Sequence, residues 1–477
     1  MQRSINRLSS LTLERLAHWG RASCCLSGLM KKRIILGVSN DSRAIKKGEV
    51  FVALTSEKDD GHRYVSAALK LGAIAAIVAK KNLSQFPESQ RSKLIAVGDP
   101  LLALQRIAAE YRKTFTIPFI GITGSSGKTT ARTFVSEVLR RKMKVGETAG
   151  NLNNHIGVPL SLLRFIGNED VGVLEMGANH TREIHLLSTI VRPSIAIITS
   201  IGYAHIGYFG SLANILRAKL EIIDGMDAPS GFLMLNGDDR LLVGAAKKIK
   251  KNVVLFGFSS GCAVRAQNFR VLSGLATSFE VGKTHYHLST AGKHFVYSAL
   301  MAIYLGKYFG IGDQLIAEAL RTIKPADMRG TIKKISGATF IIDCYNANPS
   351  SMKSGIELMD EVSAGRPKVA IVGDMLELGS YSRRLHGQLG KSIARSGVRS
   401  IIAVGNFASN IADGALRAGM RKKDIHIAPD SARALPMVKE IVRPGDVALL
   451  KGSRGVRLET IYEGLTQKRK SGHAFTH

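Results

Sequence analysis

The feature that most constrains this chain is a glycine-rich loop, residues 121–130, with the sequence GITGSSGKTT. An apolar run, residues 117–122, precedes the loop, and an amphipathic segment, residues 130–141, follows it. A loop between a strand and a helix binds phosphate through its backbone N–H groups and the positive end of the helix. In such loops the lysine, here Lys128, reaches the terminal phosphates, and a threonine hydroxyl holds Mg²⁺. The spacing is not the ordinary Walker A pattern, because Ile122 stands where that pattern has glycine.

Length and composition indicate a soluble protein of several domains. A chain of 477 residues is too long for one core, so we expect about two to four domains. Hydrophobic residues make up 45% of the chain and charged residues 22%, which is ordinary for a globular protein. No apolar run approaches the roughly 18 residues of a membrane helix, so we expect no membrane span. The cysteines, Cys24, Cys25, Cys262 and Cys344, are too scattered for a disulfide framework and suit a reducing cytoplasm.

The chain carries a large excess of positive charge. Lys and Arg number 67 against 37 Asp and Glu, which gives a net charge of +30. Such a charge attracts nucleic acid, anionic membranes or polyanionic small substrates. The basic residues are spread along the chain, and no zinc finger, helix-turn-helix or stacked-aromatic RNA motif stands out. We therefore expect no specific nucleic-acid partner.

The N-terminal segment, residues 1–26, is similar in composition to a transit peptide. It has several arginines and serines and one acid, Glu14. Residues 11–17 nevertheless have the pattern of an amphipathic first helix of a folded domain. We expect the segment to belong to the folded protein.

Apolar strands that alternate with helices divide the chain into three regions and predict an α/β fold. Continuous apolar strands of this kind imply mainly parallel sheets covered on both faces. In the first region, residues 1–115, strands are expected at 50–54 and 73–78 and a helix at 101–112. In the second region, residues 116–323, the expected strands after the phosphate loop are 171–175, 195–199, 232–236 and 253–256, with an antiparallel patch at 278–288. In the third region, residues 324–477, strands at 340–342, 369–372, 401–404 and 447–450 predict a Rossmann-like, doubly wound unit.

Several motifs resemble those of the Mur ligase superfamily, whose members join an amino group to a carboxylate at the expense of ATP. The short T-G-x-x-G-K-T form of the loop is similar to that family's loop, and residues 151–159, NLNNHIGVP, are similar to its substrate-facing segment. Further resemblance lies in residues 198–211, in residues 342–352 and in residues 373–379, GDMLELG, which are followed by His386. The resemblance implies three domains: a small UDP-binding α/β domain, a central P-loop ATPase domain with a parallel sheet, and a C-terminal Rossmann-like domain.

The resemblance also implies how ATP and Mg²⁺ are bound. The expected nucleotide contacts are Gly124, Ser125, Ser126, Gly127, Lys128, Thr129, Thr130, Arg329 and Asp343. The expected metal ligands are Thr129, Glu175, His205 and Lys219. In the resembling enzymes a lysine at this place is carbamylated, which turns a cationic side chain into a carboxylate analogue, and Lys219 matches that position. The residues expected to carry catalysis are Lys128, Lys219, His205, Arg329 and Asp343.

The substrates implied by the resemblance are UDP-N-acetylmuramoyl-tripeptide and D-alanyl-D-alanine. The first would contact Asp41, Ser42, Arg43, Asp60, Gly61 and His62 with its UDP part and Asn153 and Asn154 with the remainder. The motifs of the third region favour the branch of the family that adds the dipeptide, through an acyl phosphate, in a cytoplasmic step of peptidoglycan synthesis. Two patterns of other branches are absent from the sequence, the Asp-Asn-Pro-Arg motif and the Gly-Lys-Gly-Ser loop.

One segment departs from the family pattern. The usual His-Asn-x-x-Asn-Ala-Leu near the adenine reads HFVYSAL at residues 294–300, so Phe295 and Ser298 replace both amides. Phe295 is expected either to stack on the base or to pack within its helix. In a second departure, Ser200 replaces the usual Asn of the segment 198–211.

The sequence alone leaves two alternative functions open. One is a Mur-type ligase with a different amino acceptor, and the other is a nucleic-acid-stimulated P-loop ATPase, suggested by the net charge. The sequence leaves open whether the third peptide residue is lysine or diaminopimelate, and it leaves open the oligomeric state, with a monomer compatible.

Overall fold

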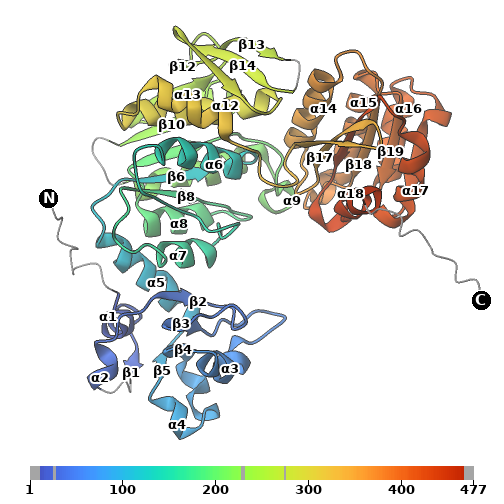
Figure 1. Cartoon of the computed structure of the whole chain (residues 1–477). Helices are drawn as coiled ribbons and strands as arrows, with labels where there is room; N and C mark the ends of the chain where they lie inside the picture. Colours follow the sequence, from blue (N-terminus) through green and yellow to red (C-terminus); the bar gives the residue numbers. More distant parts are fainter. Residues whose placement is uncertain (1–10, 25–27, 227–230, 273–274, 467–477) are drawn as a thin grey trace, which may run out of the picture.

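The polypeptide folds into three domains that follow one another along the chain (Figure 1). The computed structural model describes residues 11–24, 28–226, 231–272 and 275–466. These residues form sheets of five, seven, three and six strands. Within the same ranges, no helix is both long enough and apolar enough to cross a lipid bilayer.

The N-terminal domain is built on a mainly parallel sheet with the strand order β1-β5-β4-β3-β2. Its strands are β1 (Ser23–Cys24), β2 (Gly37–Ser39), β3 (Glu49–Val52), β4 (Ala75–Ala79) and β5 (Leu94–Val97). Its helices are α1 (Leu13–Trp19), α2 (Gly28–Lys31), η2 (Gly61–Tyr64), α3 (Val65–Lys70), η3 (Lys80–Gln85), α4 (Glu88–Arg91) and α5 (Pro100–Lys113). β1 is antiparallel to β5, and the other strand pairs are parallel. The helix α5 leads to the central domain.

The central domain contains a parallel sheet with the order β12-β11-β10-β9-β6-β8-β7. The strands are β6 (Phe119–Thr123), β7 (Val145–Glu147), β8 (Val171–Glu175), β9 (Ile195–Ile198), β10 (Phe232–Asn236), β11 (Asn252–Gly257) and β12 (Val264–Arg265). Helices α6 (Lys128–Leu139), α12 (Lys293–Tyr308) and α13 (Asp313–Thr322) pack on one face. Helices α7 (Gly157–Leu162), α8 (Glu183–Val191) and α10 (Leu212–Leu220) pack on the other. The remaining helices are α9 (Ile206–Phe209), η4 (Glu221–Gly225) and α11 (Arg240–Ala246).

A small antiparallel sheet is attached to the central domain beside α12 and α13 (Figure 1). It consists of β13 (Gln267–Val271), β14 (Thr277–Val281) and β15 (Thr284–Leu288). The alternation of side chains in residues 278–288 predicted this patch, and the structure confirms it.

The C-terminal domain contains a sheet with the order β16-β17-β21-β18-β19-β20, parallel except for β16. The strands are β16 (Thr331–Ile335), β17 (Ala338–Asp343), β18 (Lys368–Gly373), β19 (Ser400–Val404), β20 (Ile425–Ala428) and β21 (Val447–Lys451). The helices are α14 (Pro349–Ser363), η5 (Gly379–Tyr381), α15 (Ser382–Arg395), α16 (Ala408–Arg417), η6 (Lys422–Asp424), α17 (Ser431–Ile441), η7 (Arg454–Val456) and α18 (Glu459–Thr466). Helices α14 to α16 cover one face, and α17 and α18 cover the other.

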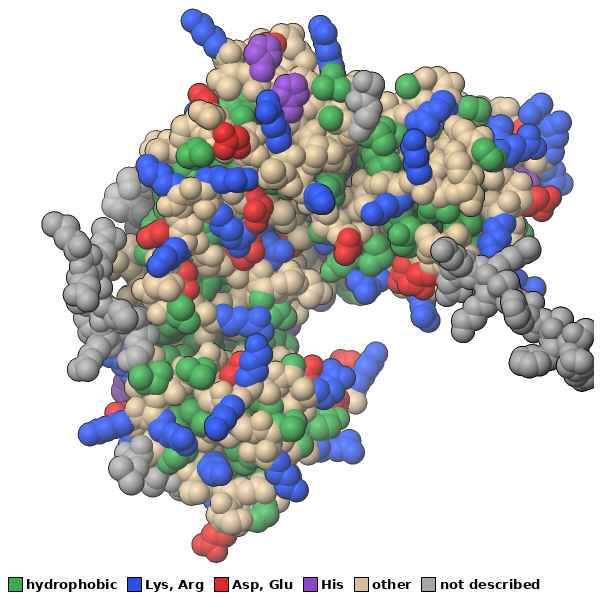
Figure 2. Space-filling model, viewed as in Figure 1, with side chains coloured by type: hydrophobic (Ala, Val, Ile, Leu, Met, Phe, Trp, Pro, Cys, Tyr) green, Lys and Arg blue, Asp and Glu red, His purple; other side chains and the backbone are tan. Residues whose placement is uncertain are grey.

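The predicted buried strands are confirmed to within about two residues at each end. The predicted first helix corresponds to α1, whose first turn is capped by the side chain of Thr12. Cys25 and the C-terminal residues 467–477 lie outside the described residues. Basic side chains lie on all three domains in the view of Figure 2, which agrees with the even spread of charge in the sequence.

Candidate active site between the central and C-terminal domains

A cavity of about 530 Å³ lies between the central and C-terminal domains. Its walls combine the glycine-rich loop, the carboxyl ends of central strands β8 and β10, the start of α12, and C-terminal residues that include Arg329, Asp343 and Lys451. Parallel sheets bind ligands at the carboxyl ends of their strands. Here the carboxyl ends of two such sheets contribute to one cavity.

The glycine-rich loop is held against the end of β9. Thr199 Oγ1 donates to the Ser126 carbonyl over 2.5 Å, and the Ser126 N–H donates to Ser200 Oγ over 3.2 Å. A side chain at Gly124 would place its Cβ 2.0 Å from Thr199 Oγ1, so this close approach requires glycine. Ser200, which replaces the family's asparagine, therefore has a role in fixing the loop.

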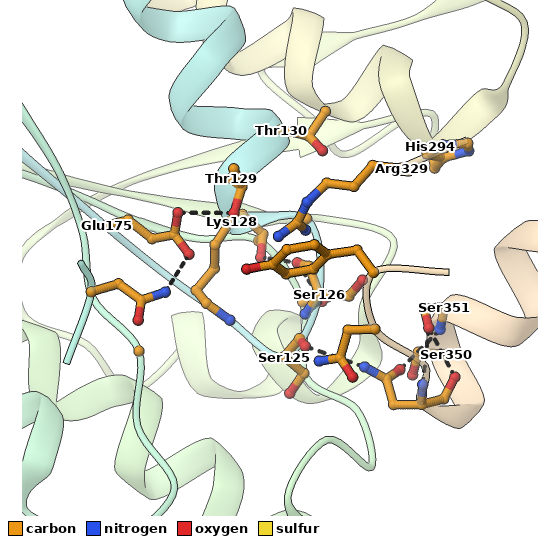
Figure 3. Close-up of a pocket in the computed structure, with 18 of the residues that line it drawn as sticks. Ser125, Ser126, Lys128, Thr129, Thr130, Glu175, His294, Arg329, Ser350 and Ser351 are labelled. Carbon is orange, nitrogen blue, oxygen red and sulfur yellow. Dashed lines mark hydrogen bonds between the residues drawn. The ribbon is translucent and has the colours of Figure 1, made fainter. Parts of the chain in front are cut away.

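Lys128 begins α6 and reaches back across the loop (Figure 3). Its Nζ donates to the Gly124 carbonyl over 2.8 Å. Burial lowers the pKa of Lys128, the nearby Glu175 carboxylate raises it, and the Arg329 guanidinium lowers it. A phosphate placed between Lys128 and Arg329 would stabilise both cations, which is the behaviour expected of a phosphate site.

Glu175 ends the buried strand β8 and is the centre of an oxygen-rich group. It is 2% exposed, accepts from Thr129 Oγ1 over 3.0 Å and accepts from Asn153 Nδ2 over 2.7 Å. Its backbone N–H donates to Thr148 Oγ1 over 2.8 Å. Mg²⁺ prefers oxygen ligands and keeps several waters or phosphate oxygens. No group of three or more His, Cys, Asp or Glu side chains that could hold a metal occurs in the described ranges.

His205 lies at the start of α9 and also lines the cavity. Its Nδ1 is 2.5 Å from Glu377 Oε2, a residue of the C-terminal domain. The contact with His205 lowers the pKa of Glu377. Sequence reasoning did not find Glu377, although it lies in the motif GDMLELG.

Lys219 lies in α10, behind the cavity wall. It is buried, its Nζ donates to the carbonyl of the wall residue Ala178 over 3.4 Å, and it lies 5.6 Å from the centre of the Phe209 ring. Burial, reinforced by the nearby Lys128, lowers the pKa of Lys219 to about 7. A solvated surface lysine would not have this environment.

The C-terminal domain contributes two cationic groups to the cavity. The Arg329 guanidinium lies 4.0 Å from the centre of the Tyr345 ring and points toward the start of α6 (Figure 3). Lys451, at the end of β21, is 1% exposed and its Nζ lies 2.5 Å from Asp343 Oδ2. Lys451 is a further site residue that sequence reasoning missed, and the signal was a lysine that ends an otherwise apolar strand.

The segment that replaces the family's amides packs against α6 and also lines the cavity, through His294, Phe295, Tyr297 and Ser298. Phe295 is 1% exposed and stacks on Phe134 of α6, with ring centroids 6.2 Å apart and an interplanar angle of 13°. Of the two expectations for Phe295, packing within the helix layer agrees with this contact. Burial lowers the pKa of the neighbouring His294 to about 4, so this ring is neutral near pH 7.

The residues expected to bind UDP follow β2 and β3 in the N-terminal domain and do not line this cavity. Asp41 and Arg43 form an exposed ion pair of 2.9 Å. His62 is buried, with Nδ1 2.6 Å from Asp60 and Nε2 accepting from the Ala79 N–H over 2.9 Å. His62 therefore holds the loop after β3 in shape. In the central domain, Asn154 accepts from the backbone N–H groups of Ile156 and Gly157 at the start of α7.

Comparison with protein families agrees with this geometry. Residues 34–112 match the Mur ligase family catalytic domain, residues 122–306 the Mur ligase middle domain, and residues 328–454 the Mur ligase glutamate ligase domain. The chain belongs to the Mur ligase family. Each domain of this Mur ligase thus corresponds to one of the family's models.

The relatives of this Mur ligase include ligases from two well-separated bacteria, Bacillus subtilis and Escherichia coli. It is 36% identical to the UDP-N-acetylmuramoyl-tripeptide–D-alanyl-D-alanine ligase of Bacillus subtilis, with 92% of this chain and 94% of that one covered. It is 31% identical to the ligase of the same name from Escherichia coli, with 90% and 93% covered.

Solved structures of MurF ligases share the architecture. A MurF structure from Acinetobacter baumannii superposes with a TM-score of 0.84 at 30% identity, covering 96% of this chain and 99% of that one. The MurF ligase from Thermotoga maritima in complex with ADP superposes with a TM-score of 0.78 at 27% identity, covering 90% and 96%.

Proposed function

We propose that this Mur ligase adds D-alanyl-D-alanine to UDP-N-acetylmuramoyl-tripeptide at the expense of ATP, which gives the pentapeptide precursor of peptidoglycan. The observation that carries the proposal is the cavity, where the phosphate-binding loop of one domain faces Arg329 of the next. The relatives named above bear the name of this activity. A site between two domains also excludes water, which a reactive acyl intermediate requires.

The first step activates the peptide's terminal carboxylate. A carboxylate oxygen bonds to the γ-phosphorus of ATP while the bond from that phosphorus to the β,γ-bridging oxygen breaks, so ADP leaves and an acyl phosphate remains. Lys128 and Arg329 supply fixed positive charge to the phosphoryl oxygens during this transfer. The backbone N–H groups of residues 124–130 hold the phosphates in line.

The second step forms the amide. The neutral amine of D-alanyl-D-alanine attacks the acyl carbonyl carbon, and the tetrahedral intermediate expels phosphate, which takes up the amine proton and leaves as HPO₄²⁻. The bond that breaks joins the carbonyl carbon to the bridging oxygen, so that oxygen leaves with the phosphate. Asp343 would help to hold the nucleotide from the C-terminal domain, beside its partner Lys451.

Oxygen and nitrogen donors near the phosphate loop fit Mg²⁺. Thr129 and Glu175 would hold one ion and His205 a second, with phosphate oxygens and water as the other ligands. Bound Mg²⁺ would neutralise charge on the transferring phosphoryl group. Asn153 and Thr129 orient the Glu175 carboxylate through hydrogen bonds of 2.7 and 3.0 Å.

The buried surroundings of Lys219 support its carbamylation. CO₂ reacts with a neutral amine, and a pKa of about 7 leaves much of Lys219 neutral at physiological pH. The product is an anion, formed by a new N–C bond with loss of one proton. That anion would lie near Lys128, whose cation it would stabilise.

The UDP part of the substrate would bind at the N-terminal domain. Asp41, Ser42 and Arg43 follow β2, and Asp60, Gly61 and His62 follow β3, so both segments lie at the carboxyl edge of parallel strands. Asn153 and Asn154 would face the rest of the substrate. The three domains would span residues 1–115, 116–323 and 324–477, and the enzyme would act in the cytoplasm.

Phosphate release tests the proposed reaction. ATP, Mg²⁺ and UDP-N-acetylmuramoyl-tripeptide would be supplied with and without D-alanyl-D-alanine, and the product would be identified by mass. Release that depends on both substrates, with a pentapeptide product, is expected. L-Lysine, L-alanine and D-glutamate offered in place of the dipeptide test the alternative acceptors, and faster turnover with any of them would contradict the proposal.

A further inference from the structure

One carboxylate of the C-terminal domain contacts the candidate metal ligand of the central domain. Glu377 Oε2 lies 2.5 Å from His205 Nδ1. Nδ1 is buried and makes no hydrogen bond of good geometry. The charged group beside it is the Glu377 carboxylate. His205 nevertheless lines the cavity, which leaves Nε2 as the ring nitrogen available to a cation there.

The loop that carries Glu377 is fixed at each of the three preceding residues. The Asp374 carboxylate accepts from the backbone N–H groups of residues 406 and 407 over 2.8 and 3.0 Å. The Met375 N–H donates to His386 Nε2 over 2.9 Å, and the Leu376 N–H donates to Ser453 Oγ over 3.0 Å. These bonds stay within the C-terminal domain. Asp374 of the motif and His386, which follows it, therefore support the loop.

The two domains also meet at this point through two hydrogen bonds to backbone carbonyls. The Gly207 N–H donates to the Glu377 carbonyl over 2.9 Å, and the Tyr381 hydroxyl donates to the Gly210 carbonyl over 2.7 Å. A Cβ at Gly207 would lie 2.8 Å from the Glu377 oxygen, so glycine is required for this approach. We call the contact of α9 with residues 377–381 the α9 joint.

Both residues of the ion pair have a left-handed backbone. The φ angles are 56° at His205 and 63° at Glu377. Non-glycine residues adopt this conformation at an energetic cost and keep it where the surrounding structure requires it, commonly at functional sites. The strain therefore lies on the two residues whose side chains meet between the domains.

We propose that Glu377 is a positioning residue that orients His205 toward the cavity, so that the His205 metal site is complete only when the C-terminal domain is docked at the α9 joint. The inference rests on the proposed role of His205 as a metal ligand. A carboxylate on the second nitrogen of a ligating histidine fixes its tautomer and ring orientation, and loss of such a partner lowers metal affinity about 10- to 100-fold. Phosphoryl transfer would then be favoured only after the two domains have met.

Binding of Mn²⁺ in the presence of ADP tests the inference without turnover. Free Mn²⁺ is measured by electron paramagnetic resonance during titration of the full chain. The variants are Glu377→Ala, Glu377→Gln and His205→Ala, and Tyr381→Phe is the matched control, because it removes another hydrogen bond of the α9 joint without touching His205. Thermal unfolding of each variant checks that it is folded, and Glu377→Gln keeps the shape of the side chain if Glu377→Ala fails this check.

We expect two classes of Mn²⁺ site in the unsubstituted chain, with the weaker class lost in His205→Ala. Glu377→Ala should weaken that class about 10- to 100-fold, Glu377→Gln should weaken it less, and Tyr381→Phe should leave it unchanged. Unchanged Mn²⁺ binding in both Glu377 variants, with loss in His205→Ala, would overturn the inference alone. Unchanged binding in His205→Ala would overturn the metal role of His205 and this inference together.

Discussion

Asp343 and Lys451 are register partners on the adjacent parallel strands β17 and β21, and their side chains form an ion pair of 2.5 Å at the end of the sheet that faces the cavity. Lys451 is almost fully buried, whereas about one fifth of the Asp343 side chain is exposed. The pair fixes a carboxylate at the edge of the nucleotide cavity, and it places a buried cation beneath it.

Loss of one member of this pair should destabilise the C-terminal domain. Lys451→Met leaves Asp343 without its partner, and we expect the free energy of unfolding to fall by up to about 3 kcal/mol, the lower end for a buried pair because Asp343 is partly exposed. Denaturant unfolding measures this change. The double variant Asp343→Asn with Lys451→Met should recover stability but not activity. Equal stability of Lys451→Met and the unsubstituted chain would show that the pair is not structural.

Lys128→Ala should remove turnover and keep the fold. Its Nζ donates to the Gly124 carbonyl of the phosphate loop, and it is expected to neutralise charge on the transferring phosphoryl group. We expect kcat to fall on the order of 10³-fold, with little change in the thermal unfolding temperature. Lys391→Ala, an exposed lysine of α15, is the control. A folded Lys128→Ala chain with normal turnover would refute the role of Lys128.

Lys219 should make activity depend on CO₂. Its pKa, lowered to about 7, means that the neutral amine is the main form above pH 7 and the ammonium the main form below it. Chain freed of CO₂ should therefore lose activity, and the same concentration of dissolved CO₂ should restore it faster at pH 8 than at pH 6. Steady-state assays after each treatment measure the recovery, and the signal of a carbamate carbon in ¹³C NMR identifies the product.

Substitution of Lys219 gives an independent check. Lys219→Ala should be inactive and partly rescued by short carboxylates, which can occupy the place of the carbamate. Lys248→Ala, an exposed lysine on the same domain, should keep full activity and respond to no carboxylate. Full activity of Lys219→Ala without added carboxylate would exclude carbamylation as a requirement.

Phe295 should contribute to stability more than to binding of ATP. Its buried ring stacks on Phe134, so Phe295→Ala should lower the free energy of unfolding by about 3 kcal/mol or more. Phe295→Leu, which keeps much of the side-chain volume, should leave the KM for ATP within about twofold. Loss of an aromatic stack on the base would cost roughly 0.5 kcal/mol or more and would raise this KM by more than that. A several-fold increase in this KM with normal stability would instead indicate stacking on the adenine.

The sequence predicted the parts of the structure that local patterns encode. The glycine-rich loop and the apolar strands were recognisable because both faces of a parallel sheet are buried, which produces continuous apolar runs. Glu175 was recognisable because it ends such a run. The edge strands β16 and β20 were missed, because they are only partly buried and contain charged or polar residues such as Lys333, Lys334 and His426.

Long-range pairs account for what the sequence did not predict. Glu377 meets His205 across a domain interface, and Lys451 meets Asp343 over more than a hundred residues of chain. Neither pair has a spacing that a local motif could reveal. Phe295 left two structures possible because an aromatic residue at that position suits either a base or a helix layer. In the structure it stacks on Phe134 and also lines the cavity.

Transfer of an oxygen atom tests the central claim most directly. The terminal carboxylate of UDP-N-acetylmuramoyl-tripeptide would be labelled with ¹⁸O, and the inorganic phosphate released during turnover with ATP and D-alanyl-D-alanine would be analysed by mass. An acyl phosphate formed in the cavity predicts one ¹⁸O atom in each phosphate released, because the carboxylate oxygen stays on phosphorus when the amide forms. Unlabelled phosphate would mean that water attacks ATP, and it would contradict an acyl-phosphate ligase.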